Sequence, residues 1–297
     1  MGSLAYAPPR VTAFGVFLAG LYVLSFAAIL LFLLEGRSFY LTPLVERAHH
    51  AGYWEWKPGG RVGRALGVTG SAMLLVLLLY SVRKRLRFLR RLGPLSRWLD
   101  IHIFLGGIGP LFIVLHSAFK VHGLVALSFW SMVAVALSGV VGRFLYLQIP
   151  RTRAGEELSL AEVEALDQEL SDRLRRSFRL SEAALLRLNA LSAPLEQRRG
   201  LLRGLLGLLF GDRGLRSDLR GFARECRTVP RGVFDDFERT VLQKALLRRR
   251  ILLWDRLHEL FHYWHVVHKP FAAVMYLFML VHIAVAVMTG YGWAGHS

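Results

Sequence analysis

Four histidines in this sequence form two pairs with the same interval. His102 and His116 bound the apolar stretch HIFLGGIGPLFIVLH, and His268 and His282 bound HKPFAAVMYLFMLVH, so the members of each pair are fourteen residues apart. Imidazoles bind metals and carry protons, and an ionisable side chain inside so apolar a segment is costly and usually functional. The repeated interval predicts one site that uses all four imidazoles.

The interval of fourteen keeps both histidines of a pair near one face of a helix. Successive helical residues turn by about 100°, so the two imidazoles point within roughly 40° of each other and lie about 21 Å apart along the axis. His265 also precedes His282, but it lies about 100° away from the face of His282. A single histidine in such a helix could equally be a packed polar residue or part of a proton path. The second helix, which has the same interval, is what favours a shared site.

The elements that must position these histidines are apolar helices. The chain of 297 residues is 54% hydrophobic and carries a net charge of +17, a combination typical of a membrane protein with its charge gathered on one side. Roughly 18–24 apolar residues are needed to cross about 30 Å of hydrocarbon. Five uncharged spans of this length predict an all-α integral membrane protein with five transmembrane helices: Val11–Leu34, Ala65–Val82, Ile101–Phe119, Val121–Gly142 and Pro270 to about Trp293.

Lysine and arginine in the connections predict the orientation. The loop 83–97 holds seven lysines and arginines and no acidic residue, whereas Lys120 is alone between spans three and four and no lysine or arginine follows Lys269. Because basic loops stay inside, we expect a multi-pass protein of the cell's inner (cytoplasmic) membrane, with its N-terminus cytoplasmic and its C-terminus outside. In the outer loop, residues 35–63, we expect Tyr53, Trp54 and Trp56 to be interfacial anchors.

Spans three and five then both run from inside to outside, which places the histidines in facing pairs. His102 and His268 lie level on the inner side, and His116 and His282 lie level on the outer side. Two facing imidazole pairs stacked across a membrane are what two bis-histidine haems require, each pair supplying the axial ligands of one iron. We therefore expect two non-covalent b-type haems in a four-helix bundle of spans two to five. The single cysteine, Cys226, excludes a four-cysteine iron–sulfur cluster and a CxxCH attachment site.

Other residues near the histidines are candidates for contact with the cofactor. Gly106 lies one turn after His102, and Gly109 lies midway between the two histidines of its span, so both would give the porphyrin clearance. Haem propionates need cationic partners. The candidates are Arg97 and Arg143 on the inner side and Lys120 on the outer side, although both arginines also satisfy the positive-inside rule.

The segment 150–257 is predicted to be a cytoplasmic helical insertion. Ser159 and Glu162 form a capping box that opens a helix through about Arg176, and a second helix is expected over 181–191. The glycine-broken stretch LLRGLLGLLFGDRG is expected to lie along the membrane surface. After Pro230 a continuous helix is expected to run into span five. The predicted organisation is 1–149 for spans one to four, 150–257 for the insertion, and 258–297 for span five and the outer C-terminus.

The HX13H pattern on two helices resembles the di-haem membrane cytochrome b superfamily. That superfamily includes the cytochrome b of quinol-oxidising complexes, the cytochrome b subunits of formate dehydrogenases and hydrogenases, and ferric reductase-like domains. The similarity covers spans two to five. As in the ferric reductase-like family, the ligands lie on the third and fifth spans, but this chain lacks a sixth span and any flavin or NADPH domain. The resemblance therefore assigns the superfamily and not a subfamily.

The resemblance implies an electron-transfer subunit between the membrane quinone pool and a partner redox protein, such as an iron–sulfur, flavin or multihaem cytochrome subunit. Besides the quinone or quinol and this protein, the lipid bilayer is an expected partner, and nucleic acid is not. Two alternatives stay open. One is a ferric reductase-like module that passes cytoplasmic electrons outward. The other is a non-redox transporter that uses the histidines as proton or metal sites.

Overall fold

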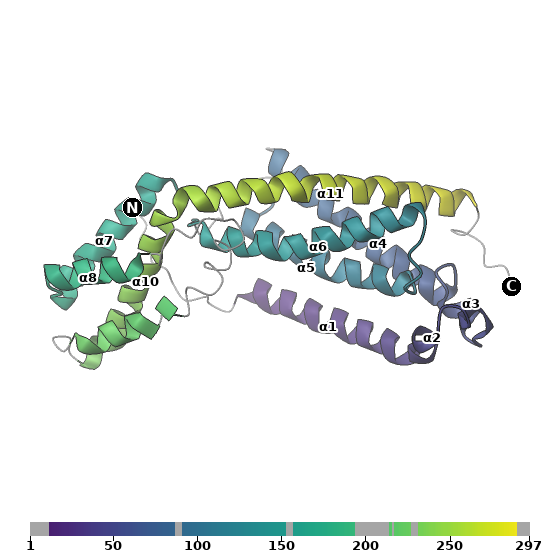
Figure 1. Cartoon of the computed structure of the whole chain (residues 1–297), viewed down its shortest axis with the longest axis horizontal. Helices are drawn as coiled ribbons and strands as arrows, with labels where there is room; N and C mark the ends of the chain where they lie inside the picture. Colours follow the sequence, from purple (N-terminus) through teal and green to yellow (C-terminus); the bar gives the residue numbers. More distant parts are fainter. Residues whose placement is uncertain are drawn as a thin grey trace. The chain divides into compact units, whose positions relative to one another are not determined.

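The chain is helical over the residues described by its computed structural model, which are 12–86, 91–152, 157–193, 214–215, 217–226 and 231–289. Over these ranges there is no strand, and the sole bridge joins Arg151 and Glu157 (Figure 1). Internal contacts divide the chain into two units. The inserted unit comprises Phe144–Tyr263, and the membrane unit ends at Arg143 and resumes at Trp264. The inserted unit begins six residues before, and ends six residues after, the predicted insertion 150–257.

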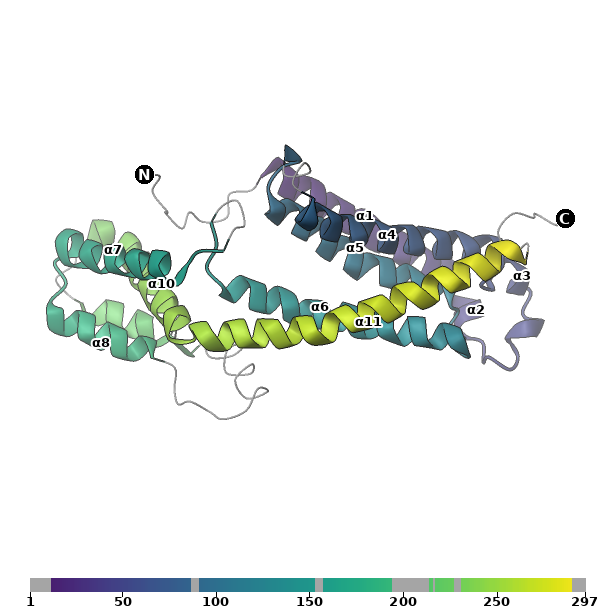
Figure 2. The ribbon, with the colours of Figure 1, turned by 90° about the horizontal axis from the view of Figure 1, so that it is seen from above.

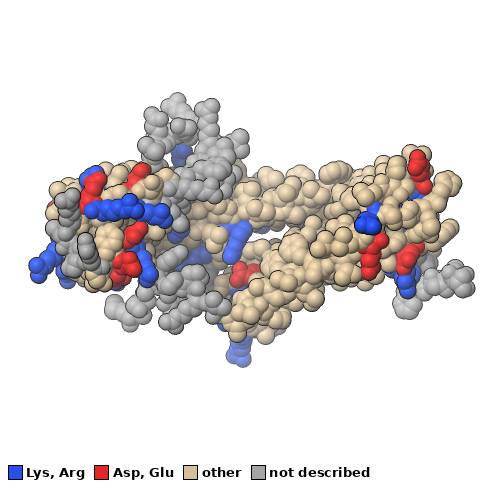
Figure 3. Space-filling model, turned by 90° about the horizontal axis from the view of Figure 1, so that it is seen from below, with Lys and Arg blue, Asp and Glu red and all other residues tan. Residues whose placement is uncertain are grey.

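Among the described residues, five helices are long and apolar enough to cross a membrane, which confirms the predicted spans. They exceed the uncharged runs at several ends because a helix continues into the polar residues that flank its apolar core. On the face of the membrane unit drawn in Figure 3, the charged side chains lie toward the two ends of that unit and the surface between them is uncharged. The five helices are α1 (Ala13–Glu35), α4 (Arg61–Arg85), α5 (Leu95–His116), α6 (Leu124–Gln148) and α11 (Trp254–Met288).

Helices α4 and α5 pack closely because small residues meet at their contact. A Cβ atom added to Gly70 of α4 would lie 3.0 Å from the carbonyl oxygen of Gly109 on α5. A Cβ atom added to Gly109 would lie 3.3 Å from the Cβ atom of Met73. Such close backbone approach is typical of helix pairs in membranes. Helix α1 lies against the other face of α5, where the ring of Tyr22 meets Phe104 edge-on at 4.9 Å.

Three short helices cover the end of α5 that carries His116. They are α2 (Arg37–Leu41), η1 (Arg47–His49) and α3 (Tyr53–Trp56). The buried Arg47 donates hydrogen bonds to the carbonyl oxygens of Tyr40 and Ala118, so it ties this cap to the residues just after α5. Trp56 is also buried, with its ring against Tyr40. The prediction that Trp56 is an interfacial anchor is therefore wrong, whereas Trp54 is exposed.

Helices α6 and α11 lie side by side (Figure 2). They pack against the group formed by α1, α4 and α5 through α4, because Leu74 and Leu77 share a buried core with Met132, Met275 and Met279. The Tyr276 hydroxyl of α11 also donates a 2.7 Å hydrogen bond to the Leu74 carbonyl oxygen. The Ser128 hydroxyl of α6 donates a 2.9 Å hydrogen bond to the carbonyl oxygen of Met275 on α11. Ten residues further along α6, the carbonyl oxygen of Ser138 accepts a 2.8 Å hydrogen bond from the indole of Trp264. The same indole fills the space where a side chain at Gly142 would lie. The space-filling view shows an opening between two arms of uncharged surface (Figure 3).

The inserted unit is built from α7 (Leu160–Phe178), α8 (Glu182–Ser192) and α10 (Phe234–Leu252), with the turn η3 (Arg231–Val233) before α10. The predicted capping box is confirmed, because Ser159 accepts from the Glu162 amide and the Glu162 side chain accepts from the Ser159 amide. Ser181 caps α8 in a similar way, close to the predicted start of that helix. The helices share one apolar core that includes Leu174, Phe178, Leu188, Phe237 and Val241.

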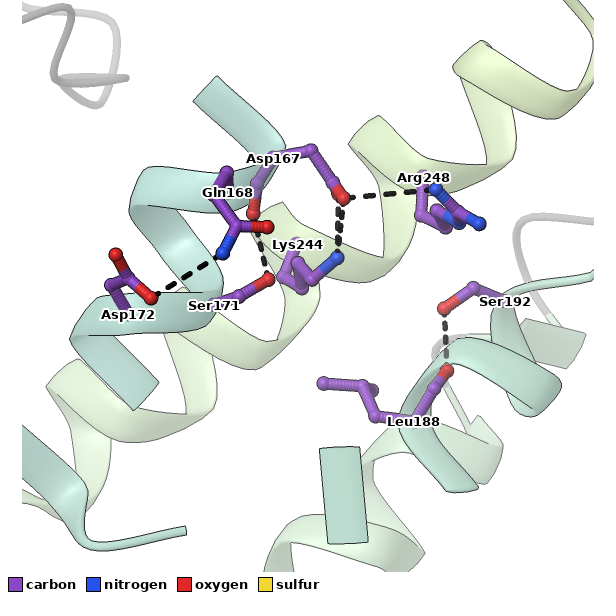
Figure 4. Close-up of polar contacts among 8 residues, drawn as sticks. All are labelled: Asp167, Gln168, Ser171, Asp172, Leu188, Ser192, Lys244 and Arg248. Carbon is purple, nitrogen blue, oxygen red and sulfur yellow. Dashed lines mark hydrogen bonds and ion pairs between the residues drawn. The ribbon is translucent and has the colours of Figure 1, made fainter. Parts of the chain in front are cut away.

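A buried ion pair also joins α7 to α10. The Nζ atom of Lys244 donates to both carboxylate oxygens of Asp167, at 2.7 and 2.6 Å, and the Arg248 guanidinium lies 3.9 Å from one of these oxygens (Figure 4). Burial is the main cause that lowers the pKa of Lys244 from its usual 10.5, and the carboxylate of Asp167 opposes this effect. The pair fixes the register of the two helices inside the apolar core.

The continuous helix expected after Pro230 is interrupted. Helix α10 ends at Leu252, and Leu253 adopts φ −105° and ψ 8° before α11 begins at Trp254. Helix α11 then continues through Pro270 without a break, so the helix before span five and the span itself are continuous, as predicted. The apolar stretch LLRGLLGLLFGDRG lies almost wholly outside the described residues.

Candidate functional site

The two histidines of α5 each lie beside a backbone acceptor of α4. His116 Nδ1 lies 2.7 Å from the carbonyl oxygen of Gly63, and the ring is partly buried. His102 Nδ1 is buried and has no hydrogen-bond partner among the described residues, and the Leu77 carbonyl is the backbone acceptor near the His102 ring. Gly63 and Leu77 are themselves fourteen residues apart. A neutral imidazole that donates from Nδ1 has its Nε2 lone pair free to bind a metal.

His116 and His282 meet between the two helix groups. Their ring centroids are 6.4 Å apart, and the ring planes are inclined by 56°. Two imidazoles that hold one metal ion can have their ring centres up to about 6.2 Å apart, because each side contributes a metal–nitrogen bond of about 2 Å and about 1.1 Å from the nitrogen to the ring centre. The observed separation therefore fits an iron bound between these two imidazoles. His282 is exposed in this structure, so its ring faces accessible space.

His268 and His102 are neighbours at the other level. His102 is among the titratable groups close enough to act electrostatically on His268. The His268 ring is held by two residues of the α6–α11 pair: Ser138 Oγ lies 2.7 Å from its Nδ1 atom, and the Trp264 ring lies 4.7 Å away at 34°. The His102 ring packs against Tyr80 of α4, with centroids 5.0 Å apart. All four predicted ligands thus lie in the membrane unit, at two levels.

The three basic residues predicted to meet haem propionates have different surroundings. Arg143 forms a 3.3 Å ion pair with Asp100, two residues before His102, and both side chains are about one-third exposed. The Arg97 guanidinium lies over the Phe14 ring of α1, 5.6 Å from its centroid. Lys120 is exposed just beyond the end of α5. Among the three, Arg143 is therefore the candidate that an ion pair links to a predicted ligand helix, through Asp100.

The glycines near the ligands act mainly on the α4–α5 contact. Gly109 faces Met73 and Gly70, so its lack of a side chain accounts for close helix packing, and porphyrin clearance at this position stays a prediction. A Cβ atom at Gly106 would lie 3.9 Å from Leu77, an ordinary contact. The glycine that most directly makes room for a predicted ligand side chain is Gly67 of α4, because an added Cβ atom there would lie 2.6 Å from His116 Nδ1.

The remaining histidines have partners of other kinds. His258 is placed between the Trp254 carbonyl oxygen, 2.8 Å from its Nδ1 atom, and the Glu157 carboxylate at its Nε2 atom. In the cap near His116, the amide of Gly52 donates to His50 Nδ1 at 3.0 Å. Both arrangements fasten local structure. No group of three or more His, Cys, Asp or Glu side chains that could hold a metal ion occurs among the described residues.

No protein-family model, curated protein or solved structure matches this chain.

Sequence reasoning missed the residues that orient the ligands. Ser138 carries no local signal, because a serine in an apolar helix often bonds its own backbone. Asp100 stands two residues before His102 and is the sole acid near the start of span three, which was a usable signal. The Gly63 and Leu77 acceptors are backbone carbonyls, which any residue type supplies.

Proposed function

We propose that this chain is a membrane-bound, di-haem b-type cytochrome that carries electrons across the membrane between the quinone pool and a partner redox protein. The observation that carries the proposal is the pairing of imidazoles between α5 and α11. His116 and His282 lie 6.4 Å apart between ring centres, a spacing at which the two imidazoles could hold one iron. Fourteen residues earlier on the same two helices, His102 lies close enough to His268 to act on it electrostatically, and these two would hold the other iron.

The residues present fit two haems in further respects. His116 and His268 direct Nδ1 to an acceptor on a neighbouring helix, which leaves Nε2 for a metal, and such outer partners orient ligands in metal proteins generally. The ligand helices come from two groups that meet through α4 and α11 and leave an opening elsewhere between them (Figure 3). An iron atom with two imidazole ligands has both axial positions filled, so each haem, when bound, supplies one-electron, outer-sphere transfer.

The chain's own contribution is position and shielding. The two levels are separated by fourteen helical residues, about 21 Å, so electrons would cross much of the hydrocarbon between them. The cap anchored by Arg47 covers the level of His116, and the hydrocarbon around the apolar helices would keep water from the open side of the site. The inserted unit, with its packed core, offers a folded surface for a partner protein.

A reduced-minus-oxidised difference spectrum of the purified protein tests the haem claim. The expected result is a b-type spectrum with two haems per chain. His102→Ala and His116→Ala should each remove about one haem, while His122→Ala, a histidine outside both pairs, should retain both. A colourless protein would support the transporter alternative and reject the proposal. Retention of both haems in His102→Ala or His116→Ala would reject the pairing.

The quinone partner needs a separate test. In vesicles that contain the pure protein, added quinol should reduce the haems, and an oxidised quinone should reoxidise them. If quinol has no effect and an external ferric chelate reoxidises the reduced haems, the ferric reductase-like alternative replaces the quinone-linked one, with the di-haem site unchanged.

A further inference from the structure

One hydroxyl group on α6 sits between His268 and the backbone of its own helix. Ser138 Oγ lies 2.7 Å from His268 Nδ1 and 2.9 Å from the carbonyl oxygen of Val135. A carbonyl oxygen accepts hydrogen bonds and never donates them, and a hydroxyl has a single hydrogen. Both contacts are hydrogen bonds at once only when the hydroxyl hydrogen goes to Val135 and Oγ accepts from His268 Nδ1.

We infer that Ser138 is a positioning residue that fixes the Nδ1–H tautomer of His268 and so directs the Nε2 lone pair toward the haem iron. This inference rests on the proposed function. The chain of donors runs from His268 Nδ1–H to Ser138 Oγ, and from the Ser138 hydroxyl to the Val135 carbonyl. This pair of hydrogen bonds leaves Nε2 as the nitrogen with a free lone pair, and it restrains the orientation of the His268 ring at its Nδ1 edge.

A second residue holds the same ring from its face. The Trp264 ring lies 4.7 Å from the His268 ring, inclined by 34°, and its indole N–H donates to the Ser138 carbonyl oxygen at 2.8 Å. Trp264 occupies the space over Gly142, where a side chain would displace it. Ser138 thus receives a hydrogen bond at its backbone and another at its side chain, both from α11. The contact restrains the ring and the helix that carries it together.

The hydroxyl also affects the strength of the ligand. An imidazole that donates its second N–H to an acceptor becomes a more basic ligand, which favours the oxidised metal. Removing the acceptor should therefore raise the midpoint potential of the haem bound at His268. The haem at His116 and His282 should keep its potential, because Ser138 does not contact either residue in the described structure.

The experiment compares Ser138→Thr with Ser138→Val in the full-length protein. The two side chains have nearly the same shape and differ in the hydroxyl group. Ser138→Thr should resemble the wild type. Ser138→Val should raise the midpoint potential of one haem and weaken retention of that haem by about 10- to 100-fold, the usual effect of losing such an outer partner. Equal potentials and equal retention in the two variants would overturn the inference.

Ser128→Ala is the matched control. It removes another buried hydroxyl bond between α6 and α11, to the Met275 carbonyl oxygen, and this bond involves no histidine. Neither haem potential should change in this variant. A shift as large as that of Ser138→Val would assign the effect to helix packing and overturn the inference.

A further readout needs no haem. In the cofactor-free protein, the nitrogen-15 shifts of His268, assigned by comparison with His268→Gln, should show a protonated Nδ1 atom, and a protonated Nε2 atom with a bare Nδ1 would overturn the tautomer. This measurement also stands if Ser138→Val fails to insert. A wild-type protein that binds no haem would refute the proposed function. A haem protein in which Ser138→Val changes nothing would refute the role of Ser138 alone.

Discussion

A methyl group added at Gly67 should remove one haem and leave the other. The Cβ atom of Gly67→Ala would lie 2.6 Å from His116 Nδ1 and 2.7 Å from Cε1, whereas ordinary contacts begin at 3.4 Å. The ring must then retreat by about 0.8 Å or α4 must shift, and such overpacking costs about 1–3 kcal/mol. Either movement disturbs the 2.7 Å hydrogen bond to Gly63, which is worth about 1 kcal/mol. Together these costs correspond to at least a 10-fold loss of haem affinity at this level.

The assay is haem content per chain, with potentiometric titration of the haem that remains. Gly67→Ala should retain the haem of His102 and His268 with its potential unchanged. Gly107→Ala is the matched control, because a Cβ atom there meets nothing within 4 Å, and it should bind two haems. The reasoning is refuted if Gly67→Ala binds both haems as tightly as the wild type, or if the haem it loses is the one at His268.

Two further predictions concern the stability of the parts around the site. Lys244→Met leaves the Asp167 carboxylate buried without its closest cation, so it should destabilise the inserted unit by about 3–5 kcal/mol in thermal unfolding of the full chain. Replacing Asp167 by Leu in the same variant should recover most of this loss. Arg248→Met removes a more distant and more exposed cation, so it should cost far less. Burial raises the pKa of Tyr40 from 10.0 to about 12, so its contribution to stability is complete below pH 10 and is lost as the pH rises through 12. Tyr40→Phe should cost about 1 kcal/mol near neutral pH by removing the hydrogen bond to the Leu115 carbonyl, and should flatten that alkaline loss; an unchanged alkaline profile would contradict it.

The helices were predictable because their signals are local. An apolar run of membrane length predicts a span wherever it occurs, and the capping box of Ser159 and Glu162 satisfies its own helix end regardless of the rest of the fold. The break at Leu253 had no such signal, since neither proline nor glycine stands near it. Trp56 was misassigned for a related reason. An aromatic residue beside a span can lie at the membrane interface or be buried in a cap over the helix ends, and its sequence position is the same in both cases. The ring of Trp56 is buried because it packs against Tyr40.

The ligands and their supports differ in how far the sequence reveals them. A histidine in an apolar helix stands out by residue type, and its partner stands out by the interval of fourteen. The acceptors on α4 have no residue type to read, because a backbone carbonyl is present at every position. Their matching interval, Gly63 to Leu77, gains meaning after the pairing of α4 with α5 is known. Ser138 is visible as a residue but not as a partner, since its distance from His268 in sequence is 130 residues.

This difference has a consequence for how the two haem levels would be tuned. On α5, the ring of His116 is held by a backbone oxygen, so a substitution on α4 acts on it by displacement, as at Gly67. On α11, the ring of His268 is held by a hydroxyl group, so a single substitution at Ser138 changes the chemistry of the ligand and leaves the helix path intact. Changes that act on the potential of one haem, together with its retention, should therefore arise on α6. Changes that act on occupancy through packing alone should arise on α4, where the packing of the ligand helix is set.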